Sequence, residues 1–128
     1  MRKEVIQTEA APQVVGPYCQ AISSNGFVFT SGQLAIDPST NQLVSGSIQT
    51  QTEQIFKNLS AVLTEAGTSL NNCVKLTVFL TDLGHFSEVN TIYQQYLGGT
   101  KQLAARSCVE VSRLPLNAQI EIEAIAIR

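Results

Sequence analysis

Histidine and cysteine are scarce in this sequence, which limits the chemistry open to it. The 128 residues include one histidine, His85, and three cysteines, Cys19, Cys73 and Cys108. A single imidazole argues against a histidine-based metal site, and a Ser-His-Asp triad would need a better-placed base. The cysteines are odd in number and match no metal-binding spacing, so we expect reduced thiols and not a disulfide framework. We expect no bound metal.

Basic runs, long apolar runs and a leader-like N-terminus are also missing. The formal net charge is −2, with no basic run and no interleaving of aromatic and basic residues, which argues against nucleic-acid binding. The longest apolar runs fall well short of the roughly 20 residues that a membrane-spanning helix needs. Residues 1–4 lead into a polar segment and not into the apolar region of a signal peptide. We therefore expect a cytoplasmic protein without a membrane partner.

Length and composition predict one domain, residues 1–128, with one core. Hydrophobic residues make up 44% of the chain and charged residues 14%, and several expected strands are apolar on both faces. A domain of this size does not readily cover both faces of a sheet. Oligomerisation is therefore expected, because an uncovered apolar face is an association site.

Hydrophobic periodicity predicts strands interrupted by two helices. In chain order the expected elements are strands at 3–8, 19–23 and 27–31, a helix at 47–67, a strand at 74–81, a helix at 86–97 and strands at 106–114 and 119–127. Asn25-Gly26 is a two-residue hairpin signal. Ser47 can cap the first helix and Gly67 can end it. This order predicts an α+β fold in which two helices cover one face of a mixed sheet.

The last two runs, 106–114 and 119–127, carry charges where a plain core strand would not. Side chains alternate along a strand. Arg106 and Cys108 therefore share one face of the first run, and Glu121 shares one face of the second run with another glutamate. An antiparallel hairpin would bring the arginine, the thiol and the carboxylates together as an anion pocket beside an acid–base group. The alternative is an ordinary salt-bridged sheet face.

Several motifs, in order along nearly the whole chain, resemble those of the RidA/YjgF family, the reactive-intermediate (enamine/imine) deaminases. They are Gly16-Pro17-Tyr18, Thr30-Ser31-Gly32-Gln33, Asp82-Leu83 with Phe86 and Val89-Asn90, Ala105 to Val111, Leu114-Pro115, and Ile120 to Ala126. The resemblance implies a chorismate-mutase-like α+β fold with a mixed six-stranded sheet and two helices on one face. It also implies a homotrimer around a central barrel of sheets, with pockets between neighbouring subunits.

The activity that this resemblance implies is hydrolysis of 2-imino acids, such as 2-iminopropanoate and 2-iminobutanoate, to 2-keto acids and ammonia, without metal or organic cofactor. Arg106 matches the family's substrate-binding arginine, whose guanidinium can grip a carboxylate through two parallel hydrogen bonds. Glu121 matches the acid that orients or activates water. Cys108 matches the pocket cysteine, whose backbone carbonyl can accept a hydrogen bond from the imine. We do not expect its thiol to be a nucleophile, because no base is evident and a neighbouring carboxylate would raise its pKa.

Four further residues complete the expected substrate-binding set. Tyr18 matches the aromatic wall, contributed from the facing subunit, although a tyrosine after a turn is otherwise typical of a core. Ser31 and Gly32 match the strand end that lines the pocket, where a small residue permits close approach. Asn90, at the margin of the second helix's apolar stripe, fits a supporting role at the subunit boundary or a bridge to backbone groups.

The chain departs from the family pattern in one segment. The family usually has proline directly before the Ala-Arg pair, whereas here Ala104 takes that place and lacks the fixed φ of proline. The loop at 98–104 is also about one residue shorter than is common. Substrate range and rate are therefore less constrained by the resemblance than the type of reaction.

Two other functions fit the same residues. One is a non-catalytic regulator or chaperone-like module that uses the cleft to bind small carboxylates. The other is a purely structural oligomer, in which replacing Glu121 would change stability or assembly and not turnover. The presence of Arg106 favours the deaminase.

Overall fold

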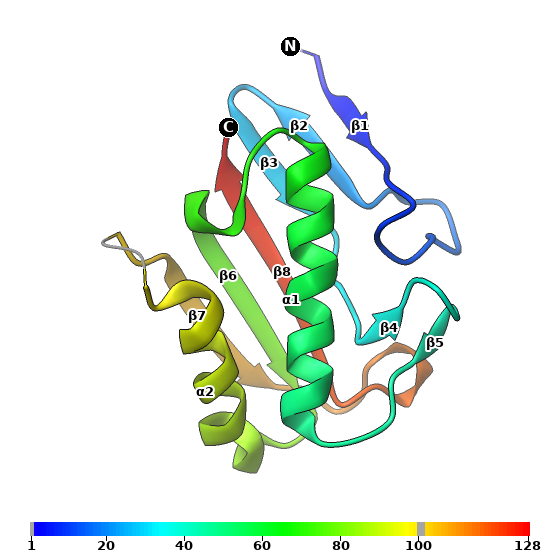
Figure 1. Cartoon of the computed structure of the whole chain (residues 1–128), viewed down its shortest axis with the longest axis vertical. Helices are drawn as coiled ribbons and strands as arrows, with labels where there is room; N and C mark the ends of the chain where they lie inside the picture. The colour runs from blue at the N-terminus through cyan, green and yellow to red at the C-terminus, as the bar shows by residue number, and fades with distance from the viewer. Residues whose placement is uncertain (1, 100–101) are drawn as a thin grey trace.

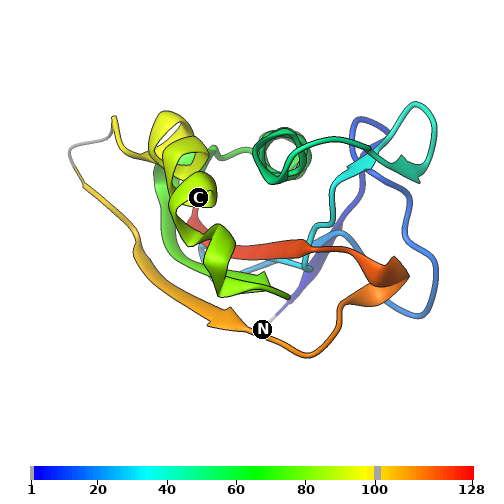
Figure 2. The ribbon, with the colours of Figure 1, turned by 90° about the horizontal axis from the view of Figure 1, so that it is seen from below.

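The computed structural model describes residues 2–99 and 102–128, which form a sheet layer and a helix layer. The sheet has six strands in the order β1-β2-β3-β8-β6-β7, and both helices lie on the same side of it (Figures 1 and 2). The main elements are β1 (Glu4–Ile6), β2 (Ala21–Ser24), β3 (Phe27–Thr30), α1 (Ile48–Glu65), β6 (Cys73–Leu80), α2 (Phe86–Leu97), β7 (Ala105–Glu110) and β8 (Ile120–Ile127), with a small separate pair, β4 (Ile36–Asp37) and β5 (Gln42–Leu43). The predicted α+β class is confirmed.

Helix α1 begins and ends where its sequence signals place it. The Ser47 side chain accepts a hydrogen bond from the Thr50 amide, which satisfies one of the free N–H groups of the first turn. Gly67 follows the helix with φ of +83°, a left-handed conformation that costs glycine little. No helix in the described ranges, 2–99 and 102–128, is long and apolar enough to cross a membrane.

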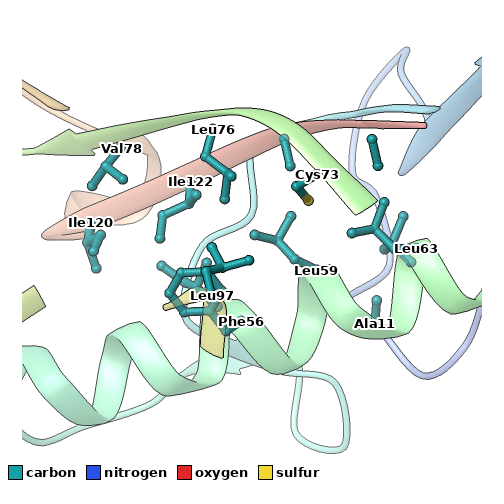
Figure 3. Close-up of a cluster of buried hydrophobic side chains, with 14 of the residues drawn as sticks. Ala11, Phe56, Leu59, Leu63, Cys73, Leu76, Val78, Leu97, Ile120 and Ile122 are labelled. Atoms are coloured by element: carbon teal, nitrogen blue, oxygen red, sulfur yellow. The ribbon is translucent and has the colours of Figure 1, made fainter. Parts of the chain in front are cut away.

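The core lies between α1 and the helix-facing side of the sheet. Side chains from α1 interdigitate there with alternate residues of β6 and β8 (Figure 3). The fully or almost fully buried members include Ile55, Phe56, Leu59, Val62, Leu63, Leu76, Val78, Leu80, Ile120 and Ile122. Burying one such side chain contributes about 1.5–3 kcal/mol, so this interface fixes β6 and β8 in the middle of the sheet.

The opposite face of the sheet is not covered by any described element of the chain. Phe27, Phe29, Val109 and Ile127 all belong to it or its edges, and each side chain is 39–46% exposed. Phe29 pairs with Ile125 and Phe27 with Ile127 across β3 and β8, so these apolar groups are contiguous. We refer to this surface as the open face. Association through such a face stays a prediction.

The predicted hairpin between residues 106–114 and 119–127 is wrong. Strand β6 lies between β7 and β8, parallel to β7 and antiparallel to β8. Helix α2 joins β6 to β7 as a crossover, the connection that parallel neighbouring strands require. The following segment then passes the end of β6, where Val111 N–H donates to the Leu80 carbonyl and Thr81 N–H to the Gln119 carbonyl. β7 therefore becomes an edge strand.

Candidate active site, divided between two faces of the sheet

The guanidinium of Arg106 is held on the helix-facing side of β7. Its Cζ lies 4.5 Å from the centroid of the Tyr93 ring and 5.4 Å from that of Phe86. One terminal nitrogen, Nη1, donates a hydrogen bond of 2.8 Å to Oδ1 of Asn90. Two aromatic faces and an amide therefore restrict the guanidinium while leaving its charge without a carboxylate partner among the described ion pairs. This arrangement suits it to bind an anion.

A cavity of about 420 Å³ adjoins the arginine. It lies along the last turns of α2 and the approach to β7, and is lined by Asn90, Tyr93, Gln94, Leu97, Gly98, Leu103, Ala104 and Arg106. Ala104, the position at which the resemblance leads us to expect proline, is thus part of its wall. Residues 100 and 101 of the loop that we expected to be short lie outside the described residues.

Cys108 lies two residues beyond Arg106 on the same side of β7, and its side chain is partly buried. Burial raises the pKa of its thiol, and the charge of Arg106 opposes that rise only in part. The predicted direction is correct, but its cause is desolvation and not a neighbouring carboxylate. A protonated thiol is a poor nucleophile. Cys19, Cys73 and Cys108 are all free, and no described group of three or more His, Cys, Asp or Glu residues could hold a metal ion.

Glu121 projects from the open face, at the start of β8. Its side chain is half-buried, and burial, followed by the like charge of Glu123, raises the pKa of its carboxyl group. The carboxyl group lies directly against Gly32: a Cβ atom at residue 32 would stand 2.7 Å from Glu121 Cδ and 2.8 Å from Oε2. Only glycine leaves this space free for the Glu121 side chain.

Ser31 ties the backbone near Gly32 to the segment that carries Tyr18. Its hydroxyl donates to the Cys19 carbonyl at 2.6 Å, and its amide donates to the Gln20 carbonyl at 2.9 Å. Tyr18 is 55% exposed, so it is not a core tyrosine.

Arg106 and Glu121 do not share a neighbourhood within one chain, contrary to the hairpin hypothesis. Arg106 pairs with Leu76 of β6, and Glu121 pairs with Phe79 of the same strand. Paired residues share a face, and Leu76 and Phe79 are an odd number of residues apart, so their side chains point to opposite faces. The chain therefore presents two separate sets of groups, which we call the arginine half-site (Asn90, Arg106, Cys108) and the carboxylate half-site (Tyr18, Ser31, Gly32, Glu121).

Comparison with known proteins shows the family directly. The sequence profile of the family described as Endoribonuclease L-PSP, which is the RidA/YjgF family, matches residues 8–128. The chain belongs to the RidA/YjgF family. A RutC family protein of Pyrococcus abyssi is 52% identical over 126 residues, covering 98% of each chain. A mouse protein named 2-iminobutanoate/2-iminopropanoate deaminase is 43% identical over 126 residues, covering 98% of this chain and 92% of its own.

Solved structures of RidA/YjgF proteins superimpose closely on this one. The Rid-family protein YyfA from Yersinia pestis matches with a TM-score of 0.96 at 49% identity, covering 99% of this chain and 100% of its own. E. coli TdcF, crystallised with bound serine, matches with a TM-score of 0.92 at 39% identity, covering 98% of both chains. The RidA-like fold expected from the motifs is therefore confirmed.

In this RidA/YjgF chain the aromatic partners of Arg106 were not predicted from the sequence. No contact of Phe86 or Tyr93 with Arg106 was predicted, yet Phe86 is 40% exposed and both rings lie beside the guanidinium. The spacing of Phe86, Asn90 and Tyr93 places all three on one helical face. That spacing was a usable signal, but their partner depended on β7 pairing beside β6.

Proposed function

We propose that this protein hydrolyses small 2-imino acids, such as 2-iminobutanoate and 2-iminopropanoate, to 2-keto acids and ammonia. The observation that carries the proposal is Arg106, whose guanidinium is fixed by Asn90 and two aromatic rings beside a cavity. Relatives named for this chemistry support it: the mouse deaminase and the Arabidopsis thaliana Reactive Intermediate Deaminase A, which is 47% identical over 126 residues.

The site we propose lies between two subunits of a homotrimer. Because the two half-sites face opposite sides of the sheet, a common cleft requires the arginine half-site of one subunit and the carboxylate half-site of its neighbour. The exposed apolar groups of the open face supply a surface for such an association. Strand β7, which carries Arg106, lies at the edge of the sheet. In the proposed trimer it lies beside the open face of a neighbouring subunit.

In this cleft Arg106 binds the substrate carboxylate through charge-assisted hydrogen bonds and so fixes the position of the imine carbon. The backbone carbonyl of Cys108 accepts a hydrogen bond from the imine nitrogen, which favours the protonated, more electrophilic form. Tyr18, Ser31 and Gly32 shape the opposite wall. Together these groups bind the two polar parts of a 2-imino acid, its carboxylate and its C=N nitrogen.

Glu121 acts as the general base in this proposal. It accepts a proton from water as the water oxygen bonds to the imine carbon and the C=N electron pair moves to nitrogen. The amino alcohol that results takes this proton from Glu121 onto its nitrogen. Ammonia then leaves with the electron pair of the C–N bond, while the hydroxyl group returns a proton to the Glu121 carboxylate and its C–O bond becomes a carbonyl. Burial raises the pKa of Glu121, which makes its carboxylate a stronger base than an ordinary glutamate.

A coupled assay tests the activity. Threonine dehydratase generates 2-iminobutanoate from threonine, and the decay of the imine is followed with and without this protein. We expect faster decay with the wild-type protein. Decay at the rate seen in buffer alone would refute the deaminase.

A regulator that binds small carboxylates without turnover is the second candidate, because all members of the arginine half-site belong to one chain and none of them is a carboxylate that could act as a base. Serine, the molecule bound to E. coli TdcF, also carries a carboxylate. Tight binding of a 2-keto acid together with absent turnover would favour this candidate. Wild-type turnover would favour the deaminase.

A further inference from the structure

Two buried side-chain amides lie on either side of the Ser31–Gly32 segment and belong to neither half-site. The residues are Gln20 and Asn58, which are only 2% and 1% exposed. A buried amide has up to four hydrogen-bonding positions and is costly to leave unpaired. Its partners therefore identify the backbone that it holds in place.

Gln20 fastens the backbone on the N-terminal flank. Its side chain accepts from the Thr8 amide at 2.7 Å and donates to the carbonyls of Thr8 and Pro12 at 3.0 and 2.9 Å. Its own backbone carbonyl accepts from the Ser31 amide. The side chain of Gln20 thus joins the N-terminal loop to the segment after Tyr18, and its backbone carbonyl joins that segment to the residue before Gly32.

Asn58, on α1, fastens the C-terminal flank. Its Nδ2 donates to the Leu34 carbonyl at 3.2 Å and to the Ile36 carbonyl at 2.9 Å. Gln54 donates to Oδ1 at 2.9 Å, which orients the amide. Between Gly32 and these carbonyls, the backbone of Gln33 exchanges two hydrogen bonds with Ile122, the residue next to Glu121.

Gly32 has no side chain by which it could be held, and its contact with Glu121 leaves no free space. The position of Gly32 therefore depends on the backbone on both sides. We propose that Gln20 and Asn58 are positioning residues that hold Gly32 against Glu121 and so set the place of the carboxyl group. This inference rests on the proposed function, in which Glu121 acts on water and Arg106 binds substrate.

Kinetics of matched variants distinguish positioning from simple stabilisation. Asn58→Ala removes the bonds to the loop, whereas Val62→Ala, one turn along α1 and equally buried, removes packing alone. We expect Asn58→Ala to lower kcat by about tenfold or more, the scale of a misplaced catalytic group, with KM within twofold of wild type. Val62→Ala should leave both constants within twofold. An unchanged kcat in Asn58→Ala, or a rise in KM alone, would overturn the proposal.

Hydrogen exchange gives a readout that needs no activity. We expect the Gln33 and Ile122 amides to exchange faster in Asn58→Ala than in Val62→Ala. Each variant is measured at the same interval below its own Tm, so that a difference in global stability does not enter the comparison. Equal exchange in the two variants would overturn the positioning role. Faster exchange in Asn58→Ala, with no turnover by the wild-type protein, would refute the proposed function alone.

Should Asn58→Ala fail to fold, Gln20→Ala tests the other flank by the same kinetics, with exchange followed at the Ser31 amide. A lowered kcat and faster exchange at Ser31 support the proposal. Wild-type values for both overturn it.

Discussion

Gly32 packs against the carboxyl group of Glu121 so closely that a Cβ atom on residue 32 would stand 2.7 Å from Glu121 Cδ. Gly32 does not have a positive φ, so its backbone conformation does not require glycine. The requirement is steric, because residue 32 and the glutamate side chain share one space. The place of the carboxyl group is therefore set by a neighbouring strand end as well as by β8.

Gly32→Ala should displace the Glu121 carboxyl group and lower kcat by about tenfold or more. Binding of a 2-keto acid should weaken less, since Arg106 is untouched. Steady-state kinetics and product titration measure the two effects. Gly26→Ala is the control, because Gly26 has φ of +83° but nothing within 4 Å of its Cβ position, so strain should lower stability and leave kcat unchanged. Wild-type kcat in Gly32→Ala would contradict this account.

Arg106→Ala should lower kcat/KM. The expected loss of transition-state binding free energy is about 2–3 kcal/mol, the scale of a charged group that anchors the substrate through hydrogen bonds. The coupled imine assay measures it. Arg113→Ala, which removes an exposed positive charge on the segment after β7, is the control and should behave as wild type. An Arg106→Ala protein within twofold of wild-type activity would remove this residue from the site.

Asn90→Asp should raise KM more than Asn90→Ala does. The wild-type amide orients the guanidinium without neutralising it, whereas an aspartate at the same place would form an ion pair that competes with the substrate carboxylate. We expect KM to rise about tenfold in Asn90→Asp, equivalent to about 1.4 kcal/mol, with a smaller change in Asn90→Ala. The reverse order would show that Asn90 does not support the arginine in this way.

Glu121→Gln should abolish turnover and raise stability at neutral pH. Burial, then Glu123, raises the pKa of Glu121 in the folded protein, so the folded state binds its proton more tightly than the unfolded state. The wild-type protein therefore loses stability as pH rises from the pKa of Glu121 in the unfolded chain to its higher pKa in the folded protein. The Tm advantage of Glu121→Gln should be present at pH 7 and absent below about pH 4. Turnover retained by a folded variant of native mass would refute the base role. Loss of assembly would favour the structural-oligomer hypothesis.

The elements of the fold were largely predictable because their signals are local. Ser47 caps α1 and Asn25-Gly26 forms the turn between β2 and β3, as predicted. The pairing of β7 was not predictable in this way, since it depends on α2 carrying the chain across to the far side of β6. The alternation of β7 and β8 correctly grouped Arg106 with Cys108, but it could not say which side of the sheet each strand presents.

The sequence selects candidate site residues but not their arrangement. Motif resemblance selected Arg106 and Glu121, yet their separation by the sheet follows from the register on β6. Asn90 was expected to be hydrogen-bonded, and its partner is Arg106 and not backbone. The supporting role of Asn58 had no sequence signal, because its partners are backbone carbonyls 22 and 24 residues away.

The most direct test of the central claim mixes two inactive proteins. Arg106→Ala and Glu121→Ala are each prepared, unfolded together in equal amounts and refolded, and the imine assay is run on the mixture. If each cleft joins the arginine of one subunit to the glutamate of its neighbour, random assembly should restore intact clefts at about a quarter of the interfaces, with activity in proportion. Activity no higher than the average of the two parents, in mixed oligomers of native mass, would contradict a site shared between subunits.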